Sequence, residues 1–234
     1  MAISTDAAVK PWLVIFVKDP RPGRVKSRLA RDLGTVGAAS WYRHHCRRLL
    51  RQVGHDRRWT TVLAVTPDRE GLESRFWPAE IMKLPQGGGD LGARMAGFMR
   101  RLPPGPAAII GSDIPGIRPS HIIRAFRLLR RHDAVFGPSP DGGYWLVGMR
   151  RRRKVSTRAF RNVRWSGEHA LADSRNSLPG HAIGHCDTLQ DVDTVDDLRP
   201  TTDATPPGGS FPRYRSPAAW PQSARDGPIR SAGH

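Results

Sequence analysis

The chain has 234 residues, which fits one α/β domain followed by a tail. With 38% hydrophobic residues it can bury a core, and this excludes wholesale disorder. No apolar run approaches the roughly 20 residues of a membrane span, and the polar start of the chain lacks the apolar region of a signal peptide. The two cysteines, Cys46 and Cys186, have no metal-binding spacing and form no disulfide framework, so we expect a cytoplasmic protein.

The formal net charge of +17 would ordinarily suggest a polyanionic partner. The excess is almost entirely arginine, a bias that a genome rich in guanine and cytosine also produces. Aromatic residues are not interleaved with the basic runs, as a base-stacking platform would require, so the sequence disfavours nucleic acid as the partner. The densest run, Arg150–Lys154, is interpreted as a solvated turn in preference to a contact for an anionic acceptor.

The first half of the chain begins with a continuous apolar run, Trp12–Val17, which predicts a strand buried on both faces of a parallel sheet. A short helix is expected over Val25–Leu33, ended by Gly34, and an amphipathic helix over Val36–Val53. The expected elements that follow are a strand over Thr60–Val65, a short helix opened by Pro67-Asp68, an extended piece over Ile81–Leu84 and a helix over Leu91–Leu102.

The second half continues the alternation of strands and helices. Its expected elements are strands over Ala107–Ile110, Ala134–Phe136, Tyr144–Val147 and His181–Cys186, and helices over Pro119–Arg131, near Gly167–Asp173 and after Asp193-Thr194. The alternation predicts an α/β fold with a single doubly wound, mostly parallel sheet flanked by helices. We expect a flexible N-terminus over residues 1–10, the folded domain over 11–199, and a disordered Pro/Gly/Arg-rich tail over 200–234.

A cationic loop, KDPRPGRVKSR, follows the first strand and runs into a helix. Ligands of open α/β sheets bind at the carboxyl ends of strands, so the loop has the right position for a site. Its cations and Gly23, beside a helix N-terminus, predict a phosphate cradle, although the glycine spacing matches neither a Walker A loop nor a dinucleotide fingerprint. The alternative is a solvated basic loop. The cations are Lys18, Arg24, Lys26 and Arg28.

Two acidic motifs are candidates for a metal site. Asp113, in the GSDIP segment after a buried strand, has the position of a carboxylate that holds a hard cation, or of a turn cap. In the run Asp191–Asp197, Asp193 or Thr194 could cap the final helix, and a carboxylate there could instead complete the metal site.

The segment GPSPDGGYW contains the Asp-Gly-Gly signal of a hairpin turn between two strands. As a functional loop, its glycines Gly142 and Gly143 would let the backbone approach a ligand. The Asp141 carboxylate would then accept a hydrogen bond from a ligand hydroxyl. Both interpretations stay open at this point.

The motif order KDPRPGRVKSRL, QGGGDLGARM, GSDIP, GPSPDGGYWLVG and DVDTVDDL resembles a bacterial family of small GT-A-fold transferases. These are the arsenosugar-biosynthesis or radical-SAM/selenodomain-associated glycosyltransferases. The chain is also similar, more distantly, to 2-phospho-lactate guanylyltransferase and to molybdopterin-cofactor nucleotidyltransferases. The resemblance covers roughly Trp12 to Leu198 and departs from the family at Ser27 and Gly167, where threonine is usual. The chain also has a single aspartate, Asp113, where many glycosyltransferases have an Asp-x-Asp element.

The resemblance implies a metal-assisted glycosyltransferase that takes a nucleotide-sugar donor, a small-molecule acceptor and Mg²⁺ or Mn²⁺. The alternative is a nucleotidyltransferase that joins a nucleoside triphosphate to a phosphorylated small molecule, and a lower alternative is a nucleic-acid-binding module. Asp113 and Lys26 would be catalytic, and Asp113 and Asp193 would hold the metal. The remaining implied roles are nucleotide binding by Lys18, Arg24, Lys26, Arg28, Gln86, Gly88, Asp90 and Arg94, and acceptor or sugar binding by Asp141, Gly142, Gly143 and Tyr144.

Removal of residues 200–234 should leave the melting temperature and nucleotide affinity essentially unchanged, because this segment has no apolar period to bury. Thermal unfolding and nucleotide titration of the full and shortened chains measure this. A large loss of either property would mean that Phe211 or Trp220 packs on the domain.

Overall fold

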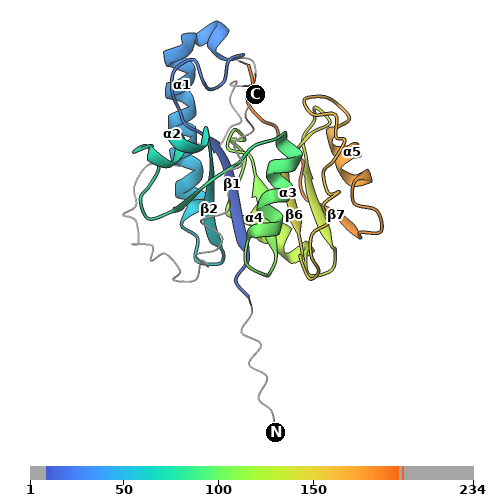
Figure 1. Ribbon diagram of the computed structural model, residues 1–234. Helices are drawn as coiled ribbons and strands as arrows, with labels where there is room; N and C mark the ends of the chain where they lie inside the picture. Colours follow the sequence, from blue (N-terminus) through green and yellow to red (C-terminus); the bar gives the residue numbers. More distant parts are fainter. Residues whose placement is uncertain (1–8, 195–196, 198–234) are drawn as a thin grey trace, which may run out of the picture.

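The computed structural model describes residues 9–194 and residue 197. The expected N-terminal segment (apart from Val9 and Lys10) and the expected tail over 200–234 lie outside this part of the chain. A central β-sheet lies between two layers of helices and connecting segments (Figure 1). Within the described residues, no helix is both long and apolar enough to cross a membrane.

The sheet has seven strands in the order β3-β2-β1-β4-β6-β5-β7. Only β6 runs antiparallel to its neighbours; every other pairing is parallel. This arrangement confirms the predicted fold class. The strands are Trp12–Lys18 (β1), Thr60–Thr66 (β2), Met82–Pro85 (β3), Ala107–Ile110 (β4), Ala134–Pro138 (β5), Tyr144–Met149 (β6) and Ile183–His185 (β7).

The helices are close to the expected ones, with one difference at the start of the first. Residues 25–29 of the helix expected over 25–33 are a bend and a turn, and the helix begins only at Ala30. Gly34 breaks it, as predicted, with non-helical angles of φ 71° and ψ 163°. The final helix expected after Thr194 falls mostly outside the described residues. The helices are Ala30–Leu49 (α1), the π-helix Leu50–Gly54 (η1), Asp68–Glu73 (α2), Leu91–Arg101 (α3), Pro119–Leu128 (α4) and Ala170–Asn176 (α5).

The apolar run of β1 divides between two cores. Leu13 and Ile15 face the core that contains α1 and α4. Trp12 and Val14 face the opposite core, which contains α3 and the segment after β6. Because successive strand residues point to opposite faces, a strand covered on both sides must be apolar throughout. This is why Trp12–Val17 has no polar alternation.

The order of the strands creates a crevice beside β1. The chain proceeds from β1 to β2 and β3 on one side and then returns to place β4 on the other side. The loops that follow β1 and β4 therefore leave the same edge of the sheet, at a topological switch point. The segment after β7 crosses to this edge through backbone hydrogen bonds from Leu189 N to Pro138 O and from Val192 N to Asp113 O. Three distant parts of the sequence meet there.

Neither cysteine is suited to thiol chemistry. Cys46 and Cys186 are both buried and unpaired. Burial raises the pKa of each thiol to about 12, so both remain protonated at neutral pH. They behave as small core side chains rather than as nucleophiles or metal ligands.

Two glycines of α3 offer a matched test of the packing. A Cβ at Gly92 would lie 2.2 Å from the Phe160 carbonyl oxygen and 2.9 Å from the Trp165 ring, whereas a Cβ at Gly97 would meet nothing within 4 Å. Gly92→Ala should therefore destabilise the fold by roughly 1–3 kcal/mol. Gly97→Ala should stabilise it by about 0.5–1 kcal/mol through its helix propensity. Denaturant unfolding measures both; equal effects would contradict the packing of α3 on the segment after β6.

Candidate functional site

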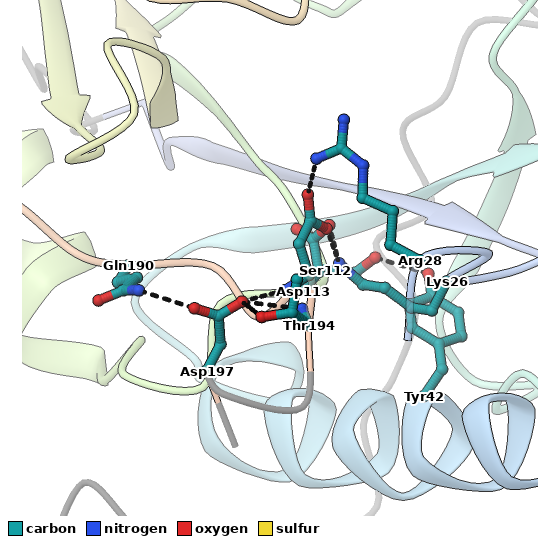
Figure 2. Close-up of polar contacts among 9 residues, drawn as sticks. Lys26, Arg28, Tyr42, Ser112, Asp113, Gln190, Thr194 and Asp197 are labelled. Carbon is teal, nitrogen blue, oxygen red and sulfur yellow. Dashed lines mark hydrogen bonds and ion pairs between the residues drawn. The ribbon is translucent and has the colours of Figure 1, made fainter. Parts of the chain in front are cut away.

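Lys26 lies at the centre of the site, in the cationic loop after β1. Its ammonium donates hydrogen bonds of 2.9 Å to Asp113 Oδ2 and of 2.9 Å to Asp193 Oδ1. Arg28 Nη1 donates to the other oxygen of Asp193 at 3.0 Å (Figure 2). The structure thus brings together Lys26 and Asp113, predicted as catalytic residues, with Asp193, predicted as a metal ligand. Lys26 adopts a left-handed φ of 48°, an uncommon conformation for a residue with a Cβ.

Asp113 is placed by a buried hydroxyl pair behind it. The Tyr42 hydroxyl, on α1, lies 2.7 Å from Ser112 Oγ (Figure 2). It also accepts a hydrogen bond of 3.1 Å from Lys18 N. Tyr42 therefore joins the ends of β1 and β4. On the other side, a Cβ at Gly111 would lie 3.0 Å from Asp113 Oδ1, so glycine leaves the room that the carboxylate occupies. Sequence reasoning missed this role of Tyr42.

The Asp193 carboxylate is free of a capping role in the described residues. The Asp197 carboxylate instead accepts the local hydrogen bonds, from Asp193 N, Thr194 N and Thr194 Oγ1. Gln190 Nε2 donates to the same carboxylate at 3.0 Å (Figure 2). Between the two alternatives left open by the sequence, the geometry favours Asp193 as a site carboxylate facing Lys26.

Asp191 is a third carboxylate that sequence reasoning did not single out. Asp191 precedes the buried residue Val192, and Asp193 follows Val192. In extended backbone, residues two apart point to the same side, so the Asp-Val-Asp spacing was the signal that could have found it. The carboxylates of Asp113, Asp191 and Asp193 each offer an oxygen within 4.8 Å of the others. Burial first, then its two acidic neighbours, raises the pKa of Asp191 to about 6.

The donor set suits a hard divalent cation. Three carboxylates provide the oxygen ligands that Mg²⁺ and Mn²⁺ prefer. Burial alone would lower the pKa of Lys26, but the Asp113 and Asp193 carboxylates raise it above its ordinary value. Lys26 is therefore a fixed positive charge whose side chain is only 7% exposed. Its ammonium and a metal ion would compete for the same two carboxylates.

Two cavities meet at this cluster. One, of about 500 Å³, is bordered by basic side chains of the loop after β1 and by the cluster itself. The other, of about 250 Å³, is mainly apolar and is walled by residues such as Tyr144, Trp145 and Trp165. The residues common to both walls are Phe16, Leu91, Gly111 and Asp113. Asp113 thus borders a cationic cavity on one side and an apolar cavity on the other.

The predicted nucleotide-binding residues divide into two groups. Those that line the cationic cavity are Lys18, Lys26, Arg28, Gln86 and Arg94. Gln86 is buried, and its Nε2 donates to Val17 O and Ala64 O, which joins the ends of β1 and β2. Arg24, Gly88 and Asp90 do not line that cavity. Arg24 Nη1 lies 3.4 Å from Glu70 Oε1, and Asp90 caps α3 by accepting from Ala93 N at 2.7 Å.

The predicted acceptor residues lie around the apolar cavity, with one exception. Asp141, Gly143 and Tyr144 line it, while Gly142 does not. Gly142 has a φ of 82°, and a Cβ there would lie 2.3 Å from the Glu168 carbonyl oxygen. Asp141 accepts a hydrogen bond of 3.0 Å from Gly143 N. The segment therefore forms the β5–β6 hairpin turn and also one wall of the cavity.

The fold is that of nucleotide-diphospho-sugar transferase-like structures. A structure from Desulfovibrio desulfuricans G20, assigned as a nucleotide-diphospho-sugar transferase, is similar with a TM-score of 0.71 and 28% identity, covering 81% of this chain and 84% of that one. CMP:2-keto-3-deoxy-manno-octonic acid synthetase in complex with CTP shares the fold, with a TM-score of 0.50 and 14% identity over 81% of this chain and 95% of that one.

Residues 49–167 match the model of a family described as "Uncharacterized protein conserved in bacteria (DUF2064)", and the chain belongs to this family. The matched range contains Arg94, Asp113 and the β5–β6 hairpin, whose turn lines the apolar cavity. It contains neither Lys26 nor Asp193. A comparison with curated proteins gave no match.

Substitution of Lys26 separates its two contacts. Lys26→Gln should raise the affinity for Mn²⁺ alone by about tenfold, or ~1.4 kcal/mol, because the competing ammonium is removed from Asp113 and Asp193. It should lower the affinity for nucleoside diphosphate by a similar factor, because a charge-assisted contact to phosphate is lost. Calorimetric titration of each ligand measures both. Arg127→Ser, an exposed substitution on α4, is the control and should change neither; weaker Mn²⁺ binding to Lys26→Gln would contradict the competition.

Proposed function

We propose that the chain is a metal-assisted glycosyltransferase that uses a nucleotide-sugar donor and a small-molecule acceptor. The observation that carries the proposal is the pair of cavities that meet at Asp113. The cationic cavity suits the diphosphate of a donor, and the apolar cavity offers a separate place for the second reactant. The similarity to the Desulfovibrio structure and the sequence resemblance to arsenosugar-biosynthesis and radical-SAM/selenodomain-associated transferases support it.

In this proposal the chain's own residues bind the donor and stabilise its leaving group. Lys26 and Arg28 border the cationic cavity and would contact the diphosphate, with Lys18 and Arg94 on the same wall. Asp113, Asp191 and Asp193 would hold Mg²⁺ or Mn²⁺, which supplies Lewis-acid neutralisation of the diphosphate. As negative charge develops on the departing diphosphate, fixed cations stabilise it most where water is excluded.

The acceptor would occupy the apolar cavity, with its hydroxyl beside Asp113. Asp141 lines this cavity and would accept a hydrogen bond from the acceptor hydroxyl, which orients it toward the donor. Tyr144 forms part of the wall, and its own hydroxyl lies 3.0 Å from Ser174 Oγ, so that hydroxyl is already engaged. The proposal places the reaction in the cytoplasm, where the two reduced thiols are stable.

Identification of the released product tests the reaction type. A panel of nucleotides and nucleotide sugars with Mn²⁺ identifies the donor through the rise in melting temperature, because a ligand that binds only the folded state stabilises it. Turnover of that donor should release nucleoside diphosphate. Release of pyrophosphate from a triphosphate would instead show the nucleotidyltransferase alternative and overturn glycosyl transfer.

The division of the site is tested by a substitution in the apolar cavity. Trp165→Ala should raise the KM for the acceptor at least fivefold, because the Trp165 ring borders the apolar cavity and not the cationic one. The affinity for nucleotide should change less than twofold. Steady-state kinetics and nucleotide titration measure the two effects, and equal losses in both would contradict separate subsites.

A further inference from the structure

The basic run Arg150–Lys154 lines a hollow of its own. From the sequence, this run was interpreted as a solvated turn. In the structure it follows β6 and, together with Asp133 and the segment 179–181, surrounds a cavity of about 470 Å³. The run is thus part of a concave surface rather than an isolated protrusion.

This hollow lies at the other end of the sheet from the candidate transfer site. β6 connects the two: Tyr144, its first residue, lines the apolar cavity, and Met149, its last, lines the hollow. A strand of this length spans roughly 17 Å at the usual rise per residue. The carboxyl ends of the parallel strands, where Lys26 and Asp113 meet, are therefore remote from the hollow. Its chemistry is independent of the proposed function.

Four of the five cations around the hollow have no partner among the described residues. In the part of the chain that the structure describes, the side chains of Arg150, Arg152, Arg153 and Lys154 make no hydrogen bond or ion pair. The one carboxylate on the wall, Asp133, already accepts a hydrogen bond of 3.0 Å from Ala182 N. The wall thus has five cationic side chains against one carboxylate. Such an excess favours an anionic ligand.

The turn that carries these cations is held in place. Arg151 has a left-handed φ of 54°, and its Nη2 donates to the carbonyl oxygens of Leu102 and Pro103, the latter at 2.8 Å. These contacts fasten the turn to the connection between α3 and β4. On its other side, Val155 is buried in the core that contains α3. The neighbouring guanidinium groups are therefore mounted on a fixed backbone.

The geometry points to a small molecule that bears phosphate or diphosphate groups, and we propose that the hollow is its binding site. Guanidinium groups form paired hydrogen bonds with phosphate oxygens. The cavity volume falls within the range of small-molecule pockets, about 300–1,000 Å³. Apart from the His181 imidazole, the described residues on its wall include no aromatic ring on which nucleic-acid bases could stack. These features favour a compact phosphorylated ligand over a nucleic-acid strand.

Calorimetric titration of the full chain with inorganic pyrophosphate, without metal, tests the proposal. Two sites per chain are expected, one at the hollow and one at Lys26. The double variant Arg152→Ser/Arg153→Ser should weaken the hollow site at least tenfold and leave nucleotide affinity unchanged. The control Arg48→Ser/Arg127→Ser removes the same charge from exposed helix positions and should change pyrophosphate binding less than twofold. Lys26→Gln should weaken only the pyrophosphate site at Lys26. Loss of binding at the hollow and loss of binding at the candidate transfer site are therefore measured separately.

Several results would overturn the proposal. Equal losses in the double variant and its control would show nonspecific attraction to a basic protein. A single pyrophosphate site that survives Arg152→Ser/Arg153→Ser would show that the hollow binds no phosphate. Tighter binding of an oligothymidylate than of pyrophosphate, abolished by the same variant, would show a nucleic-acid surface. Lys154→Gln, tested alone, repeats the measurement should the double variant lower the melting temperature.

Discussion

Three carboxylates held close together at one edge of a sheet require positive charge nearby, and the rest of the site depends on how this chain supplies it. Lys26 bridges Asp113 and Asp193, two residues that lie 80 positions apart in the sequence by their numbers. Carboxylates whose oxygens lie within 4.8 Å of one another repel, and a cation between them offsets that repulsion. The ammonium therefore links the loop after β1, the loop after β4 and the segment after β7.

The same constraint explains the backbone around the cluster. Lys26 reaches the carboxylates from a left-handed position, and Tyr42 holds the ends of β1 and β4 at a fixed separation. Val192 N donates to Asp113 O, which keeps the third segment in register with the second. A site built in this way is organised before a ligand binds, which reduces the entropy cost of binding. Metal and diphosphate would then replace contacts that the chain makes with itself.

Much of the fold could be predicted because its signals are local. The apolar run Trp12–Val17 identifies a central strand, and Gly34 marks a real break in the first helix. Asp113 was predictable because a carboxylate after a buried strand falls at the ligand-binding edge. The start of the first helix was less predictable. Residues 22–29 form turns from which Lys26 contacts Asp113, and nothing in the local sequence specifies that contact.

The features of the site that could not be predicted from the sequence depend on contacts between residues far apart in the chain. Asp191 joins the cluster because the segment after β7 pairs with the β4 loop, and this pairing follows from the strand order. Arg24 turns toward Glu70 on α2, although its position in the cationic loop suggested a phosphate contact. Asp90 caps α3 and does not line the cationic cavity, although the resemblance implied nucleotide binding. The basic run after β6 lines a hollow together with Asp133 and residues 179–181, which are distant from it in the sequence.

The most direct test of the account is Asp113→Asn, which preserves the shape of the side chain and removes the charge that would hold a divalent cation. Melting temperature and Mn²⁺-dependent nucleotide affinity are measured on the same variant. If Asp113 holds the metal, the melting temperature stays close to that of the parent chain and Mn²⁺-dependent affinity is severely reduced, while weak metal-free binding persists through Lys26 and Arg28. A lower melting temperature with an unchanged Mn²⁺ dependence would contradict it and would leave Asp113 a structural residue.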